Sequence, residues 1–167
     1  MCASKTKQKF VENQGENMKK VGFVTYNSLP NFQSGWTHNQ EKSRSALVVQ
    51  DTNGRGSLEE GRRTRSADEI REEITKLWAI LDQTIPELDH LVVYIGSSGS
   101  ERAIELAKKM PAEKLTFVGC DCGISRKEAM IQSAGLGAAK RFLCDCGGHR
   151  EMESMIRFYL QSGTIGG

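Results

Sequence analysis

The sequence predicts a three-layer α/β fold, in which a mainly parallel sheet of about five strands lies between helices. Three observations predict it. Short apolar runs rich in β-branched residues recur along the chain. From residue 90 onward each run is followed by a Gly-containing turn and an amphipathic stretch, and these units recur at a constant step of 24 residues. Because parallel strands need a crossover, three tandem βα units predict three parallel neighbours whose turns share one edge of the sheet.

This arrangement is Rossmann-like or flavodoxin-like, and folds of that kind hold ligands at the carboxyl edge of the sheet. A single α/β domain is expected over residues 18–163. Residues 1–17 are polar and lack a sustained period, so they are interpreted as a flexible extension, and 164–167 as a flexible tail.

Length and charge limit the class of protein. A chain of 167 residues suits one domain with a substantial core. Lys and Arg number 23 against 21 Asp and Glu, an excess too small to indicate a nucleic-acid partner. No apolar run approaches the ~20 residues of a membrane span, and the N-terminus lacks the apolar core of a signal peptide. We therefore expect a cytoplasmic protein without a membrane partner, whose sheet edges could pair in a homo-oligomer.

The first half of the chain predicts two strands and one helix. The strands are expected at 21–27 and 46–51, joined without an evident helix, so an antiparallel strand in this half stays open. Ser66 and Glu69 form a capping box that starts a helix reaching about residue 83. Its apolar stripe, expected in the core, consists of Ile70, Ile74, Leu77, Trp78 and Leu81.

Residues 28–45 are interpreted as a long polar loop. Loops of this length without their own structure are uncommon unless they are functional. Trp36 and His38 place an aromatic ring and an imidazole on it, which indicates a lid that could fold over a ligand at the sheet edge.

Three turns carry the candidate chemistry. They are GSSGSER (96–102), CDCGISR (120–126) and CDCGGHR (144–150). The shared Gly, at 99, 123 and 147, is expected to supply a positive φ or a close backbone approach. The shared Arg, at 102, 126 and 150, would oppose the helix macrodipole and therefore needs a compensating anion, either Asp121 or Asp145 or a bound anionic ligand.

The cysteines form two copies of a C-x-C pair. In an extended segment the side chains at i and i+2 share a face, and neighbouring strands lie ~4.8 Å apart, so two pairs on adjacent strand ends could bring four sulfurs together. Four thiolates suit zinc or an iron–sulfur cluster. The predicted metal ligands are Cys120, Cys122, Cys144 and Cys146, with His149 as a further ligand or proton carrier.

Other interpretations of the cysteines stay open. A single intervening residue makes a poorer chelate than the usual zinc spacing. The cysteines could be core hydrophobes, strained and easily reduced disulfides, or nucleophiles beside a helix N-terminus.

Two further function classes also stay open. A nucleotide- or phosphate-handling enzyme would bind an anion through Gly96, Ser97, Ser98, Gly99, Ser100, Arg126 and Arg150. Asp51, Asp121 or Asp145 would then accept from a sugar or hold Mg²⁺. No G-x-G-x-x-G follows the first strand and no Walker lysine is present, so an ordinary dinucleotide or P-loop site is unsupported. The third class is a non-catalytic partner-binding domain in which the cysteines only pack.

Overall fold

The structure is a computed structural model that describes residues 18–52, 66–96, 100–144 and 149–165. Its centre is a six-stranded sheet in the order β2-β3-β1-β4-β5-β6. All neighbouring strands are parallel except β2, which runs antiparallel to β3. The strands are β1 (Lys20–Thr25), β2 (Gly35–Asn39), β3 (Arg44–Gln50), β4 (His90–Tyr94), β5 (Leu115–Gly119) and β6 (Lys140–Leu143).

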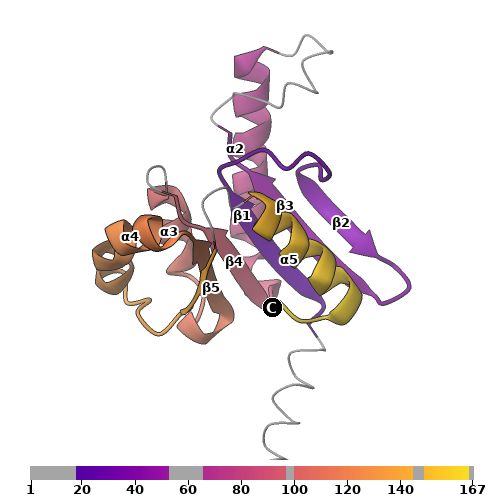
Figure 1. The fold of residues 1–167 in the computed structure, drawn as a ribbon. Coiled ribbons are helices and arrows are strands. Elements are labelled where there is room, and N and C mark those ends of the chain that lie inside the picture. The colour runs from indigo at the N-terminus through magenta and orange to yellow at the C-terminus, as the bar shows by residue number, and fades with distance from the viewer. Residues whose placement is uncertain (1–17, 53–65, 97–99, 145–148, 166–167) are drawn as a thin grey trace, which may run out of the picture.

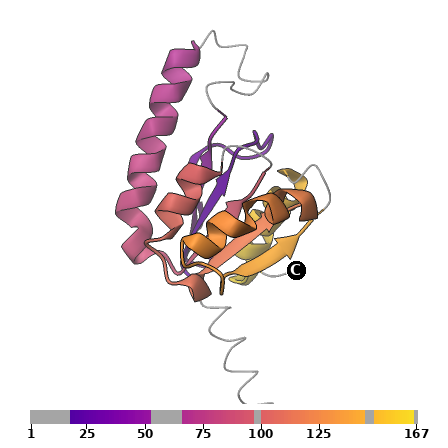
Figure 2. The ribbon, with the colours of Figure 1, turned by 90° about the vertical axis from the view of Figure 1, so that its left-hand side faces the viewer.

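Helices cover both faces of the sheet and complete three layers. The described helices are α2 (Ala67–Thr84), α3 (Glu101–Ala107), α4 (Asp121–Ser133) and α5 (His149–Ser162), with short 3-10 turns at Ile85–Glu87 and Ala112–Lys114. One apolar cluster joins the sheet to α2, α3 and α4, and a second joins its other face to α5, which lies over β1 and β3 (Figures 1 and 2). No described helix is long and apolar enough to cross a membrane.

The strand order locates the place where ligands usually bind. With β2 set aside, the five parallel strands lie in the order second, first, third, fourth, fifth, which is compatible with a doubly wound, flavodoxin-like sheet. After β1 the chain moves to β3 on one side, and after β4 it moves to β5 on the other. The carboxyl ends of β1 and β4 therefore flank the switch point.

The prediction of a long loop at 28–45 is wrong for the central part of that segment, which forms strand β2. The strand makes a hairpin with β3, with Gly35 opposite Val48 and Asn39 opposite Arg44. It was missed because it is an edge strand, and edge strands carry polar residues in place of an apolar run.

Helix α2 confirms Ser66 as the expected N-cap and four of the five residues of the expected apolar stripe as buried. The Ser66 side chain accepts a hydrogen bond from Glu69 N at 3.1 Å and caps the helix. Ile74, Leu77, Trp78 and Leu81 are buried beneath α2, so the helical period identified the face that meets the sheet.

The step of 24 residues appears in the pairing of strands but not in the helices. Leu91 lies opposite Leu115, and Thr116 lies opposite Lys140, so these paired residues are 24 apart. The helices, however, begin at Glu101, Asp121 and His149, and the third packs on the opposite face from the first two. A repeated βα module is therefore not confirmed.

Candidate functional site

The first cysteine pair lies where β5 turns directly into α4. The strand ends at Gly119 and the helix begins at Asp121, so Cys120 is the N-cap and Cys122 already belongs to the first turn. The expectation that an extended backbone aligns this pair is wrong, because the helix starts inside the motif. The first turn nevertheless brings the two sulfurs together, with Cys120 Sγ 3.2 Å from Cys122 Sγ.

The position of Cys120 favours negative charge on its sulfur. Its Sγ accepts a hydrogen bond from Gly123 N at 3.4 Å, one of the amides that a helix N-terminus leaves without an intrahelical partner. The macrodipole of α4 acts in the same direction. Cys120 is half-buried while Cys122 is exposed. A reagent can therefore reach the pair from solvent.

Gly123 allows a close contact with the backbone at Ile95 and does not have a positive φ. The described glycines with positive φ are Gly35, Gly135 and Gly163. A Cβ on Gly123 would lie 3.1 Å from Ile95 O and 3.4 Å from Cys120 Sγ. The absence of a side chain thus lets α4 begin against the end of β4. The corresponding Gly99 and Gly147 lie outside the described residues.

The second cysteine pair is described only in part. Cys144 N donates a hydrogen bond of 2.9 Å to Gly119 O, so the two motifs follow adjacent strand ends. The Cys144 side chain packs against the apolar cluster beneath α5. The structure does not describe Asp145, Cys146 or the side chain of His149. In the described parts of the chain, no three His, Cys, Asp or Glu side chains come together as metal ligands.

The structure describes little of the expected anion site. Ser97, Ser98 and Gly99 lie outside the described residues. Ser100 is fully buried, and its hydroxyl accepts from Gly96 N at 3.3 Å, which closes the turn on itself. Arg126 and Arg150 are exposed on two different helices, as is Asp121 beside the first cysteine pair. Binding of an anion by this set stays a prediction.

The Arg of the first turn has a partner that the sequence did not indicate. Arg102 Cζ lies 4.7 Å from the centre of the Trp78 ring, so a cation–π contact stabilises this cation without neutralising its charge. The indole Nε1 in turn donates a hydrogen bond of 2.9 Å to Asp51 Oδ2 at the end of β3. Trp78 is buried, as expected, but it also links a carboxylate to a guanidinium at the carboxyl edge.

Tyr26 is a further group at this edge that sequence reasoning missed. It directly follows β1 and packs against the apolar cluster on the α2 side. Burial raises the pKa of its phenol well above the usual value, and the charge of Asp51 raises it further. Tyr26 is therefore neutral across the physiological range. No sequence signal separates it from an ordinary strand-end tyrosine.

Hydrogen bonds to Gln50 of β3 and Glu153 of α5 hold the segment from 28 to 34. Leu29 N donates to Gln50 Oε1 at 2.6 Å, and Gln50 Nε2 donates to Phe32 O at 2.9 Å. Asn31 donates from its backbone and side chain to the buried Glu153 carboxylate of α5, at 3.0 and 3.1 Å. These contacts fix the segment against the sheet and α5.

Trp36 and His38, expected on a lid over the sheet edge, lie on β2. Their rings stack at 6.1 Å, and His38 Nδ1 is 2.7 Å from Ser45 Oγ on the neighbouring strand. Closing over a ligand would require β2 to leave β3. The lid stays an untested prediction.

Comparisons of the chain with protein-family models, curated proteins and solved structures found no match.

Proposed function

We propose that Cys120 and Cys122 form a thiol–disulfide redox centre. The observation that supports it is the 3.2 Å between the two sulfurs. A disulfide bond is ~2.05 Å long, so the sulfurs need to approach by only about 1 Å to close it. Because a single residue separates them, the disulfide would be strained and easily reduced, so the dithiol can reduce only substrate disulfides whose reduction potential is higher still.

The two cysteines would have different roles. Cys120, held by the Gly123 amide, attacks a substrate disulfide as a thiolate and displaces one thiolate of the substrate. Cys122 then loses its proton and attacks Cys120 Sγ in the mixed disulfide, which releases the second substrate thiolate. The protein dithiol is oxidised by two electrons, and the substrate disulfide is reduced to two thiols. The substrate class is a small or protein disulfide that reaches an exposed edge.

A reducing compartment suits this chemistry, since the dithiol is the working form. A cytoplasmic location is therefore part of the proposal.

Peptide mapping tests the proposal directly. Trypsin would release Cys120 and Cys122 together in peptide 115–126, and Cys144 and Cys146 in peptide 142–150. After treatment with glutathione disulfide we expect an internal disulfide in 115–126. In Cys120→Ser or Cys122→Ser we expect a persistent glutathione adduct on the remaining thiol. Cys2→Ser, distant in sequence, is the matched control and should behave as wild type. Two unmodified thiols, or a stable adduct in the wild-type peptide, would refute the redox centre.

A second candidate function is a metal or cluster site made by both cysteine pairs. The hydrogen bond from Cys144 N to Gly119 O favours it, because it aligns the two strand ends that precede the pairs. Cys120, Cys122, Cys144 and Cys146 would then be the ligands of zinc or an iron–sulfur cluster. Elemental analysis of anaerobically purified protein tests this function. Stoichiometric zinc or iron in the wild type, and its loss in Cys144→Ser, would support it. Metal-free protein with reduced thiols would exclude it.

Binding of a nucleotide or phosphate compound at turn 96–102 also stays a prediction. A thermal-shift screen checks it, since a ligand at 100 times its Kd adds ~2.7 kcal/mol of stability. A partner-binding domain with structural cysteines would instead show thiols that react only after denaturation.

A further inference from the structure

We propose that the hollow between α2 and α3 binds a small organic anion with an apolar body, held by Arg102. This inference is independent of the redox centre, since none of its residues belongs to the cysteine motifs. Its ligand class follows from three features of the hollow: its apolar lining, its fixed guanidinium and the pairing of its other charges.

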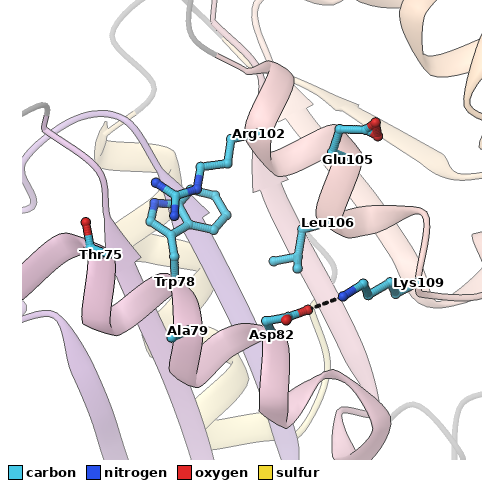
Figure 3. Close-up of a pocket in the computed structure, with 8 residues that line it drawn as sticks. All are labelled: Thr75, Trp78, Ala79, Asp82, Arg102, Glu105, Leu106 and Lys109. Carbon is cyan, nitrogen blue, oxygen red and sulfur yellow. Dashed lines mark hydrogen bonds and ion pairs between the residues drawn. The ribbon is translucent and has the colours of Figure 1, made fainter.

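The hollow has the volume of a small-molecule site and is open to solvent. Its volume is about 400 Å³, within the range typical of ligand pockets. Ala79 on α2 and Leu106 on α3 provide apolar surface on opposite walls, as Figure 3 shows. Such walls suit an aromatic or branched aliphatic group.

Arg102 lies at one end of this hollow with its guanidinium held in place. Its Cζ lies 4.7 Å from the centre of the Trp78 ring, a cation–π contact that places the guanidinium beside the hollow. The hydrogen bond from Trp78 to Asp51 fixes the indole in turn. A carboxylate or sulfonate would therefore meet a preorganised, bidentate donor.

The other charges of the hollow are already paired. Lys109 forms an ion pair with Asp82 at the end away from Trp78 (Figure 3). Glu105 pairs with Lys108 at 2.7 Å. Among the described residues, no salt bridge involves Arg102. Arg102 is therefore the charged lining residue to which the described residues give no ion pair, and a monoanion would complement it.

Two fluorescent probes separate the roles of charge and apolar surface. Anilinonaphthalene sulfonate has the proposed chemistry, and phenylnaphthylamine is its uncharged analogue. We expect the sulfonate to bind the full-length protein saturably at one site. Arg102→Gln should weaken sulfonate binding by about tenfold or more, because a charge-assisted contact is lost, and should leave binding of the neutral probe unchanged.

Two further variants complete the test. Ala79→Phe fills the hollow from an exposed helix position and should abolish binding of both probes. Arg157→Gln is the matched control, since Arg157 also lies over an aromatic ring, Phe32, but on α5. It should change neither affinity. The proposal is overturned if the wild type shows no saturable sulfonate binding, if Arg102→Gln acts no differently from Arg157→Gln, or if Ala79→Phe leaves binding intact.

Discussion

The indole Nε1 of Trp78 donates a hydrogen bond of 2.9 Å to Asp51 Oδ2, which ties α2 to the carboxyl end of β3. Both residues are withdrawn from water, at 3% and 8% exposure. Loss of one partner of a buried hydrogen bond costs free energy, so this bond matters for stability as well as for orientation. It also sets the plane on which the Arg102 guanidinium lies.

We expect Trp78→Phe to lower the free energy of unfolding by about 1–3 kcal/mol, because the donor to Asp51 and part of the ring volume are lost. Urea denaturation followed by circular dichroism measures the change. Trp36→Phe is the control, since Trp36 is 38% exposed on an edge strand and its replacement should cost less than about 0.5 kcal/mol. Equal effects of the two substitutions would show that the bond to Asp51 contributes nothing.

His90 should make the fold less stable in mild acid. Burial, with smaller contributions from Lys140 and Lys114, lowers the pKa of His90 from 6.5 to about 4. Between these values the unfolded chain binds a proton that the folded chain does not, so stability falls as the pH falls below 6.5. From pH 7 to pH 5 we expect a loss of about 2 kcal/mol from this residue.

The variant His90→Gln isolates that contribution. Glutamine can keep a hydrogen bond to Thr116 Oγ1, which lies 2.8 Å from His90 Nε2, but it does not titrate. The stability difference between the variant and wild type should therefore change by about 2 kcal/mol across this pH range. Parallel pH curves for the two proteins would contradict the account.

Gly119→Ala should be more destabilising than Gly123→Ala. A Cβ at Gly119 would lie 2.5 Å from the backbone oxygen of Ile95, which cannot yield without moving β4, so we expect a loss of about 1–3 kcal/mol. At Gly123 the nearest atom would be 3.1 Å away, and the helix propensity of alanine offsets part of the crowding. Thermal unfolding of both variants checks the order, and a reversed order would argue against this packing of α4.

Local patterns in the sequence predicted most of the sheet and helix α2. Apolar β-branched runs located β1, β3, β4 and β5, since buried parallel strands are apolar on both faces. The short strand β6, KRFL, has no such run and was located by its place before a Gly-containing turn. Strand β2 escaped this reasoning because an edge strand needs no such run. The start of α4 at Asp121 also escaped it, since Asp-Cys-Gly in the motif favours a turn as much as a first helical turn.

The candidate sites depended on contacts that no local pattern encodes. The stacking of Arg102 on Trp78 joins residues on two helices, and it became visible only once α3 was placed beside α2. For the cysteines, the expected meeting of side chains at one edge depended on an extended backbone. The backbone turned instead, and this paired Cys120 with Cys122 within one motif.

The most direct measurement of the redox proposal is an equilibrium titration of the protein in glutathione buffers of known potential, with the disulfide in peptide 115–126 quantified by mass spectrometry. We expect a two-electron transition between about −120 and −270 mV, the range of catalytic dithiols. That transition should persist in Cys144→Ser and disappear in Cys120→Ser. A peptide 115–126 that stays fully reduced at every potential, or a disulfide that joins it only to peptide 142–150, would contradict the proposal.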